Sequence, residues 1–436
     1  MGGVRRLSAP AGAPGRLVSE LRPAPVAEDI SAQVAELIAA VRSEGDAAVV
    51  EQARRFDNAE FTASRIRVSP EVIAREAECL DRPLAAAIVA AADQVRSVAE
   101  AGRPQTRDVE LDAGQRIQLR QVPVGAAGCY VPGGRAAYPS SLIMAAVPAM
   151  VAGVGRIAVA SPAGDDGLPA RAILGAAGIL GIEEVYGLGG VAAVAALAIG
   201  TESVEPVNVI TGPGNSWVQE AKRQLVGEIG IDGIAGPSEV VVIADESADP
   251  RVIAYDLLAQ AEHGPDSPAI LASADVAVLE AVAAELAAGP RADGPISLVE
   301  CASMDDAVGL AEAFAPEHLQ LNTEEADTLS ERITTAGAVF IGPGGGTAFG
   351  DYVAGSNHIL PTGGAARFAS AVGPAPYLRR MSVVDMSPQA ITQLTPHLAA
   401  LAQAEGSRRR SAAAPRCRSP PGRDTRPSAR SPRQTV

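Results

Sequence analysis

Three short segments of the chain carry side chains that could bind a metal or move a proton. Gln260 and His263 stand three residues apart at the end of an expected helix, which projects both from one helical face. Glu317 and His318 are adjacent, so a base that titrates near neutral pH stands beside a carboxyl group. Such a pair suits proton abstraction from an alcohol, followed by activation of water. Asp351, in the loop GDYVAGSNHILPT, is a candidate hard-oxygen metal ligand.

Each of these segments also has an ordinary structural explanation. Gln260 and His263 could be polar residues of an exposed helix end, and Glu317 and His318 could belong only to the turn after a helix-breaking proline. Asp351 could cap a turn. The chain has only four histidines, so each one in a turn bounded by glycine or proline has to be weighed. Taken singly, the segments leave both explanations open.

Glycine-rich turns follow several of the expected strands. GPGN at 212–215 and YVPGG at 130–134 are turns in which glycine lets backbone N–H groups approach a phosphate or a ring. The segment VYGLGGVAAVAA gives a weak nucleotide-binding fingerprint with Gly187, Gly189 and Ala192. A single match of this kind also occurs in many proteins that bind no nucleotide.

Charge and apolar patterning exclude several classes of protein. The formal net charge of -15 argues against nucleic acid or an anionic membrane as the main partner, because both require a basic surface. The most apolar stretch, about 141–160, is interrupted by Pro148, Gly153 and Arg156, and is typical of a buried helix followed by a strand. No apolar run of signal-peptide length follows the N-terminus. We therefore expect a soluble, cytoplasmic protein.

The cysteines favour the same compartment. Cys79, Cys129, Cys301 and Cys417 lie far apart and form no CxxC pair, so the sequence predicts neither a disulfide framework nor a zinc finger. Cys129 could be the nucleophile of an aldehyde-oxidising enzyme. Its neighbours are apolar and no histidine stands near it in the sequence, so we interpret it as a core cysteine.

The elements that must position these residues alternate between strands and helices. The first hundred residues are helical, with helices over 30–56, after Ser69, and over 82–101. From Val124 onward, short apolar runs alternate with helices, and a second series begins with EVVVIAD after the AGPS turn. This spacing predicts βαβ units in two α/β lobes that join near residue 236. A last amphipathic helix covers 388–405.

The final segment differs in composition from everything before it. Residues 407–436 contain nine arginines and one acid, with almost no large apolar residue. Such a segment cannot bury enough surface to fold, and we expect it to be disordered.

Taken together and in order, the motifs resemble histidinol dehydrogenase. The resemblance extends from about Ile30 to Glu405 and is carried by YVPGGRAAYPSS, ALAIGTESV, TGPGNSWVQEAKRQL, GIDGIAGPSEVVVIAD, LLAQAEHGPDS, APEHLQL and GDYVAGSNHILPT. It implies two incomplete Rossmann-like lobes, of the aldehyde-dehydrogenase type, with small terminal arms that interlock two subunits of a homodimer. It implies a zinc-dependent, four-electron oxidation of L-histidinol through L-histidinal to L-histidine with two NAD.

The resemblance also assigns binding residues. Gln260, His263 and Asp351 would be zinc ligands, and the metal would hold the amine and imidazole nitrogens of the substrate. Ser238, His318 and Glu405 would contact the substrate as well.

The family's chemistry assigns a further role to His318 and roles to three more positions. His318 would be the general base that takes the hydroxyl proton while a hydride leaves to NAD, and Glu317 would activate the water that hydrates the aldehyde. Tyr130 and Asn215 would bind the cofactor. The zinc would act mainly as a template that orients the reacting carbon.

The sequence departs from the family pattern in three places. Ala192 stands where the family commonly has a cofactor-contacting glutamine, and Ala145 and Met150 replace polar residues in MAAVPAM. The family ends with a substrate-binding glutamate, here Glu405, and a zinc-ligating histidine five residues later, where this chain has Arg410. A guanidinium has no free lone pair and cannot bind zinc. One hypothesis is that the chain after Gly406 is out of its ancestral reading frame.

The resemblance gives a domain organisation and leaves two other functions open. We expect an N-terminal arm at 1–25, a catalytic and metal-binding lobe at 26–128 and 237–370, an NAD-side lobe at 129–236, a C-terminal arm at 371–406, and the disordered tail. The alternatives are a dehydrogenase of the same fold that oxidises another small amino alcohol or diol, and a catalytically impaired homologue that lacks the last zinc ligand.

Overall fold

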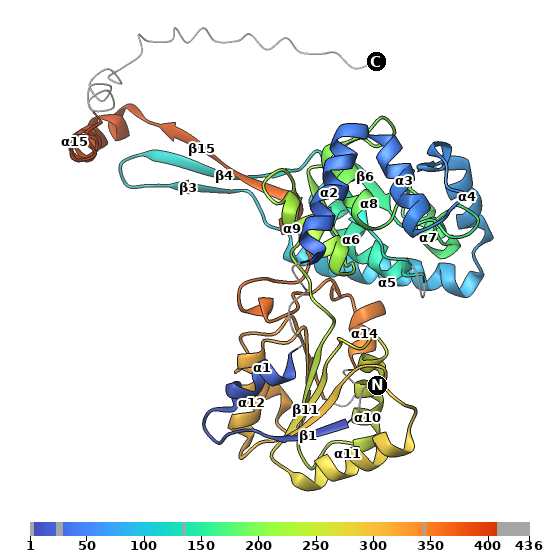
Figure 1. The fold of residues 1–436 in the computed structure, drawn as a ribbon. Helices are drawn as coiled ribbons and strands as arrows, with labels where there is room; N and C mark the ends of the chain where they lie inside the picture. The colour runs from blue at the N-terminus through green and yellow to red at the C-terminus, as the bar shows by residue number, and fades with distance from the viewer. Residues whose placement is uncertain (1–3, 23–28, 134–136, 343–345, 408–436) are drawn as a thin grey trace, which may run out of the picture. The chain divides into compact units, whose positions relative to one another are not determined.

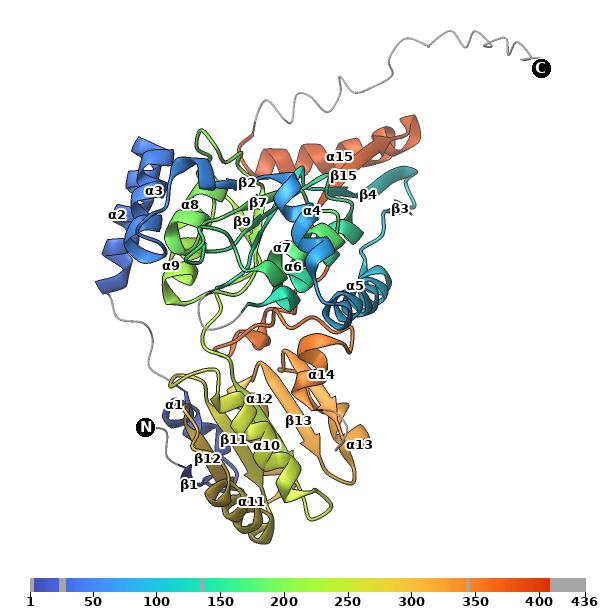
Figure 2. The same ribbon diagram turned by 90° about the vertical axis from the view of Figure 1, so that its right-hand side faces the viewer.

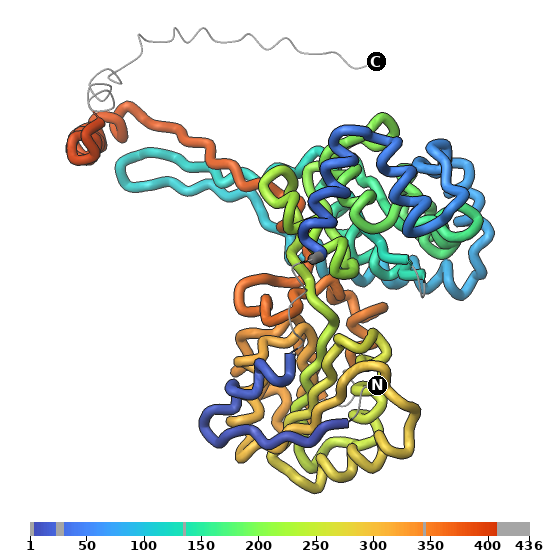
Figure 3. Tube along the Cα trace, in the orientation of Figure 1, coloured from blue at the N-terminus to red at the C-terminus, as the bar shows by residue number. Residues whose placement is uncertain are grey.

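The computed structural model describes residues 4–22, 29–133, 137–342 and 346–407 (Figure 1). The chain divides into two units, one made of Met1–Arg103 and Pro123–Leu378, and the other of Pro104–Val122 and Arg379–Val436. The larger unit contains two six-stranded sheets, and the trace of the chain through them can be followed in Figure 3. The expected α/β class, with two lobes built on mainly parallel sheets, is confirmed.

One sheet of the larger unit is parallel throughout and has the strand order β1-β12-β11-β10-β13-β14. Its strands are β1 (Val4–Ser8), β10 (Val240–Ala244), β11 (Ala269–Ser273), β12 (Ile296–Glu300), β13 (His318–Asn322) and β14 (Ala338–Ile341). The central strands are buried along their whole length, as the run VVVIA of β10 illustrates. Apolar β-branched runs of this kind form strands that are covered on both faces.

Helices cover both faces of this sheet. Alternate strand residues pack on either side: Val241 and Ile243 contact one core, and Val240 and Val242 contact the other. The first core is closed by α1 (Val18–Leu21) and α12 (Met304–Phe314), and the second by α10 (Pro250–Ala261) and α11 (Val276–Ala288), which are seen in Figure 2. The short helices α13 (Ala326–Ser330) and α14 (Thr347–Tyr352) follow β13 and β14.

The other sheet has the order β2-β7-β6-β5-β8-β9, and only β2 is antiparallel to its neighbour. Its strands are β2 (Arg67–Val68), β5 (Ala126–Tyr130), β6 (Arg156–Ala160), β7 (Glu184–Tyr186), β8 (Val209–Thr211) and β9 (Gly230–Ile231). Eight helices are arranged around it: α2 (Asp29–Glu44), α3 (Asp46–Phe56), α4 (Pro70–Cys79), α5 (Arg82–Gly102), α6 (Pro139–Ala152), α7 (Arg171–Ile179), α8 (Gly190–Ile199) and α9 (Ser216–Leu225).

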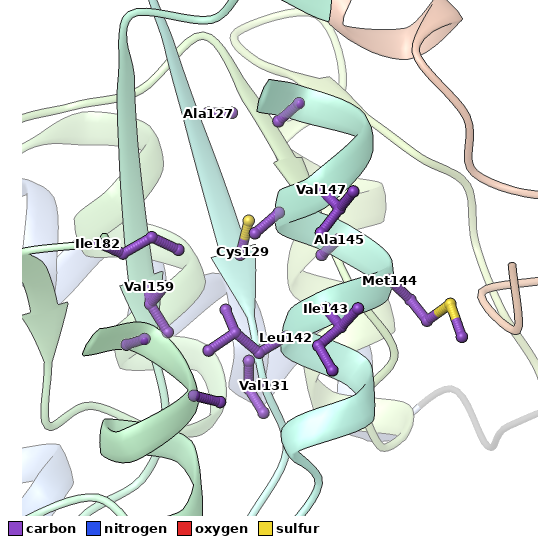
Figure 4. Close-up of a cluster of buried hydrophobic side chains, with 14 of the residues drawn as sticks. Ala127, Cys129, Val131, Leu142, Ile143, Met144, Ala145, Val147, Val159 and Ile182 are labelled. Atoms are coloured by element: carbon purple, nitrogen blue, oxygen red, sulfur yellow. The ribbon is translucent and has the colours of Figure 1, made fainter. Parts of the chain in front are cut away.

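The two faces of this second sheet have separate cores. Figure 4 shows one of them, where Cys129 and Val131 of the β5 segment pack against Leu142 and other apolar residues of α6. Helices α4, α5 and α7 complete this core, whereas α2, α3, α8 and α9 close the opposite face. Cys129 is fully buried, and burial raises the pKa of its thiol to about 12, so the prediction of a core cysteine is confirmed.

Two of the expected domain boundaries need correction. Helices α2 to α5, which the sequence grouped with the lobe that continues at 237–370, pack against the sheet formed by β5 to β9. The first residues, expected to form an arm, supply β1, whose five residues pair with β12. The pattern of an amphipathic helix or edge strand shows that it has an apolar face, but not which sheet that face covers.

The chain after β14 returns to the second sheet. Ile359, Val372 and Tyr377 belong to the core that contains α6. The Tyr377 hydroxyl lies 2.8 Å from the Thr211 hydroxyl and donates to the backbone oxygen of Ala145 at 2.7 Å. These contacts fix the path of the segment that carries Asp351.

The smaller unit consists of one sheet and one long helix. Its strands, in the order β15-β4-β3, are β15 (Leu378–Met386), β4 (Gln115–Pro123) and β3 (Arg107–Glu110), and its helix is α15 (Pro388–Ala404). Arg410, Cys417 and the predicted disordered tail from 408 lie outside the described residues. Within the described part of the chain, no helix combines the length and apolar character that crossing a membrane requires.

Candidate active site

The candidate catalytic residues gather at the N-terminal edge of the parallel sheet that contains β10 and β13. These strands are neighbours with Val240 opposite His318, so Ser238 and Glu317, which precede them, meet at that edge. Gln260 lies in the last turn of α10, which returns the chain to the same edge before β11. The sequence shows which of these residues are neighbours along the chain, such as Glu317 and His318. Which of the segments lie close together in space depends on the register of the sheet.

The Glu317 carboxylate is the centre of this cluster. Its Oε2 accepts a hydrogen bond from the Ser238 hydroxyl at 2.6 Å and from the Glu239 backbone N–H at 2.9 Å. The same oxygen lies 3.4 Å from Nδ1 of His318. Glu317 is 7% exposed, so these donors replace nearly all of the water that a carboxylate normally binds.

His318 lies between carboxylates. Its Nδ1 is 3.3 Å from the Glu239 backbone oxygen, and its Nε2 is 3.5 Å from Oδ1 of Asp351. Burial by itself lowers the pKa of His318, but the negative charges of Glu317 and Asp351 outweigh that effect and raise the pKa to about 10.

Asp351 also faces the other histidines. Burial raises the pKa of this carboxyl, but the hydrogen bond and charge of His318, together with the charges of His358 and His263, give a net lowering. The backbone oxygen of Asp351 lies 2.7 Å from Nδ1 of His358, and the His358 Nε2 lies 3.3 Å from the Ser141 hydroxyl on α6. Asp351, expected in a loop, thus lies in α14, and His358 links this helix to α6 while the Asp351 carboxylate is directed at His318.

The donor set of Gln260, His263 and Asp351 fits a divalent cation. The Gln260 side chain is buried, its Oε1 lies 3.5 Å from the Ser238 hydroxyl, and its Nε2 has no hydrogen-bond partner. A buried amide without a partner is costly unless a ligand completes it. An amide oxygen, an imidazole and a carboxylate are all zinc ligands by chemistry. Among the residues that the structure describes, no three His, Cys, Asp or Glu side chains form a group that could hold a metal by themselves.

A second buried carboxyl group lies behind Glu317. Glu239 is 2% exposed and pairs with Arg22 at 3.2 Å. Burial raises the pKa of Glu239 to about 7, although the Arg22 guanidinium acts in the opposite direction. No sequence pattern predicted this pair, because Arg22 and Glu239 are separated by 217 positions.

A cavity of about 720 Å³ opens at the carboxyl ends of β5 to β8. Tyr130 and Asn215, the predicted cofactor residues, both line it, together with Gly133, Gly189 and Ala192. The amide oxygen of Asn215 caps α9 by accepting from the N–H groups of Trp217 and Val218 at 3.1 Å. Its amide nitrogen remains available to a ligand. This position matches the crevice where doubly wound sheets bind nucleotides.

A buried ion pair shapes the GPGN turn beside this cavity. Lys222 Nζ lies 2.7 Å from Oδ1 of Asp232, and both side chains are at least 95% buried. Asp232 accepts from the Gly212 N–H at 2.7 Å, and Gly212 has a φ of 123°, a conformation that favours glycine. The sequence motif contains Lys222, but only the fold shows what it holds.

Asp57 is the residue of the cavity that the sequence analysis missed. It follows the last residue of α3, and its carboxylate accepts from the Gly189 backbone N–H. Burial raises the pKa of Asp57 to about 6. One feature of the sequence could have indicated a role for Asp57. A carboxylate at the C-terminal end of a helix faces the negative end of the helix dipole, which is unfavourable for stability and therefore suggests another function.

The remaining predicted residue belongs to the smaller unit. Glu405 is the C-cap of α15 and is exposed. The structure thus brings together Ser238, Gln260, Glu317, His318 and Asp351 by direct contacts, with His263 close enough to influence Asp351. It places Tyr130 and Asn215 together in the cavity.

The fold and the site define an α/β enzyme with a buried acid–base pair and a nucleotide-type cavity. The sequence pattern of the histidinol dehydrogenase family matches residues 21–418. The histidinol dehydrogenase of Ruegeria pomeroyi is 45% identical over 388 residues, 86% of this chain and 89% of that protein. That of Caulobacter vibrioides is 43% identical over 391 residues, 87% of this chain and 90% of that protein.

A solved structure gives the same result in three dimensions. The crystal structure of histidinol dehydrogenase from Elizabethkingia anophelis superposes with a TM-score of 0.89 at 31% identity, covering 94% of this chain and 97% of that one. The chain belongs to the histidinol dehydrogenase family, and it is an oxidoreductase.

The buried ion pair gives a test of how the GPGN turn is held. Lys222→Met leaves the Asp232 carboxylate buried without its partner, and we expect it to lower the free energy of unfolding by about 3–5 kcal/mol. Lys222→Met combined with Asp232→Asn should recover a substantial part of that loss, because no lone charge remains. Chemical denaturation of the three proteins measures both effects. Equal stability of wild type and Lys222→Met would show that the pair does not stabilise the fold.

Proposed function

We propose that the protein is a zinc-dependent histidinol dehydrogenase that oxidises L-histidinol through L-histidinal to L-histidine with two NAD, as the last step of histidine biosynthesis. The observation that carries the proposal is the contact chain from Ser238 through Glu317 and His318 to Asp351. It joins a base, a carboxyl group and a metal ligand around one site in a chain of this family. The three cysteines that the structure describes, Cys79, Cys129 and Cys301, are unpaired, which suits a cytoplasmic location.

Gln260, His263 and Asp351 would hold the zinc. When bound, zinc would supply a positive charge that holds the amine and imidazole nitrogens of the substrate. The partnerless Gln260 amide supports this assignment, since a cation would take up its oxygen after a flip of the amide group. A fourth ligand at Arg410 is excluded by the chemistry of its side chain.

His318 would remove the hydroxyl proton through Nε2. Its Nδ1 lies beside the Glu239 backbone oxygen, which favours the proton on Nδ1 and leaves the Nε2 lone pair free. Glu317 is the largest cause of the raised pKa of His318, and Asp351 contributes to it. A cation held by Asp351 would weaken the contribution of Asp351 and so lower this pKa.

Glu317 would act in the second oxidation. Water must add to the aldehyde carbon before a second hydride can leave, and a carboxylate adjacent to His318 can take the proton of that water. The hydrogen bonds from Ser238 and Glu239 fix the orientation of the Glu317 carboxyl group. The cavity lined by Tyr130 and Asn215 would take NAD in both steps.

We also propose a homodimer with shared active sites, built through the smaller unit. Its strands and helix expose apolar side chains that a monomer would leave in water: Val109, Leu111, Met381, Val383, Val384, Met386, Leu398 and Leu401. Glu405, the expected substrate ligand, stands at the end of the same helix.

The dimer is tested by Leu401→Asp. Leu401 is 66% exposed, so the substitution should leave the subunit folded but place a charge in the proposed interface. We expect a dimer-to-monomer shift in sedimentation velocity and loss of most activity. Val276→Asp, at an apolar site of the larger unit that is 44% exposed, is the matched control and should remain dimeric. A monomeric wild type would refute the proposal.

The reaction is tested by its stoichiometry and by His318. Protein loaded with zinc should form two NADH per histidinol, and His318→Asn should lower kcat by about 10²–10⁴ while the melting temperature is kept. NADH absorbance follows both. Activity only with other amino alcohols would favour the alternative substrate, and no activity with any of them would favour the impaired homologue. Unchanged turnover in His318→Asn would remove that residue from the mechanism.

The zinc site is tested by metal content. Gln260→Ala and Asp351→Ala should each reduce bound zinc by at least about tenfold after dialysis, as measured by elemental analysis, because each removes a ligand. Glu262→Gln is a matched control, since this exposed carboxylate lies between two proposed ligands in the sequence and should keep its zinc. Equal zinc in all four proteins would place the metal elsewhere.

A further inference from the structure

We propose that Asp57 selects the cofactor: its carboxylate accepts hydrogen bonds from the ribose hydroxyls of a nucleotide and excludes a nucleotide that carries a phosphate at that ribose. The inference rests on the proposed function, because it requires that the cavity beside β5 to β8 binds a dinucleotide. It adds the residue that decides between NAD and NADP.

Asp57 lies where a nucleotide would meet the sheet. It lines the cavity with Tyr130, Gly189 and Asn215. Its two carboxylate oxygens are so close to Gly189 that a side-chain carbon added there would lie 3.0 and 3.1 Å from them. The carboxylate therefore lies directly over the turn that begins α8.

The start of α8 is already occupied by the protein's own side chains. The Gly189 N–H donates to Asp57, and the Gly190 N–H donates to the Tyr130 hydroxyl at 3.2 Å. In many dinucleotide-binding folds such N–H groups bind a phosphate. Here a second anion at this turn would face the Asp57 carboxylate and would be repelled.

The described walls of the cavity carry no cationic side chain that would offset that repulsion. Among the described residues that line it, Asp57 and Tyr130 carry the ionisable side chains, and none is lysine or arginine. A ribose phosphate is usually bound by a cationic side chain, whereas a ribose hydroxyl is bound by an acidic one. The cavity therefore has the chemistry for a nucleotide with free ribose hydroxyls.

A purely structural role for Asp57 would be to cap α8. An asparagine side chain also accepts a hydrogen bond from a helix N-terminus and is as good a cap as aspartate. Asp57→Asn therefore keeps the cap and the shape of the cavity but removes the negative charge. If Asp57 only caps α8, cofactor selection will not change in this variant.

The chain offers a direct measure of binding. Trp217, its only tryptophan, lines the same cavity, so its fluorescence should respond to a bound nucleotide without any turnover. NAD and NADP are titrated into wild type, Asp57→Asn and Glu51→Gln. Glu51 is an exposed carboxylate on the same helix, α3, and its substitution makes the same change in net charge outside the cavity.

We expect wild type and Glu51→Gln to bind NAD and to bind NADP much more weakly. In Asp57→Asn the ratio of the two dissociation constants should fall by at least about tenfold, through weaker NAD and stronger NADP binding. Melting temperatures report folding, and Asp57→Ser, which also provides a capping oxygen, replaces Asp57→Asn if that variant is unstable.

The outcomes separate the inference from the proposed function. If wild type binds NAD and the ratio is unchanged in the folded Asp57 variant, or if wild type binds both nucleotides equally, the role of Asp57 is refuted and the proposed function stands. If NAD neither changes the fluorescence of wild type nor supports histidinol oxidation, the cofactor assignment itself fails and the inference falls with it.

Discussion

The buried carboxylate of Glu317 is the group on which the candidate site depends. A carboxylate that is nearly excluded from water needs donors, and it finds them in the Ser238 hydroxyl, the Glu239 N–H and the neighbouring His318. The same oxygen thus fixes the start of β10 relative to the start of β13. Removing the charge would leave three polar groups without their partner, so folding and chemistry depend on one interaction.

The charge around this group explains why a metal would matter. Asp351 and Glu317 raise the pKa of His318 well above neutrality, and Glu239 adds a further buried carboxyl group nearby. Such an accumulation of acidic groups is unstable unless cations balance it. Arg22 balances Glu239, and a divalent ion held by Asp351 would balance the remainder. The metal proposed for the reaction would therefore also reduce the repulsion between these acidic groups.

The larger unit uses opposite edges of its two sheets. The acid–base residues gather at the N-terminal edge of one sheet, because α10 returns Gln260 there and because Glu317 precedes β13. The cavity lies at the carboxyl edge of the other sheet, beyond Tyr130 and Asn215. Glycine turns, a helix cap and the Lys222–Asp232 pair shape that second edge. Parallel strands make this possible, since each edge collects the loops from only one end of every strand.

The sequence by itself determined the elements and the local pairs. Apolar periodicity gave the alternating strands and helices, and spacing along one helix or one turn placed Gln260 with His263 and Glu317 with His318. Only the tertiary structure decided which sheet the first helices cover, that β1 joins a sheet, and that Asp57 faces the cavity. Apolar periodicity and helix capping depend on residues that are close together in the sequence. These contacts join positions more than a hundred residues apart, and only packing selects among the faces that could meet.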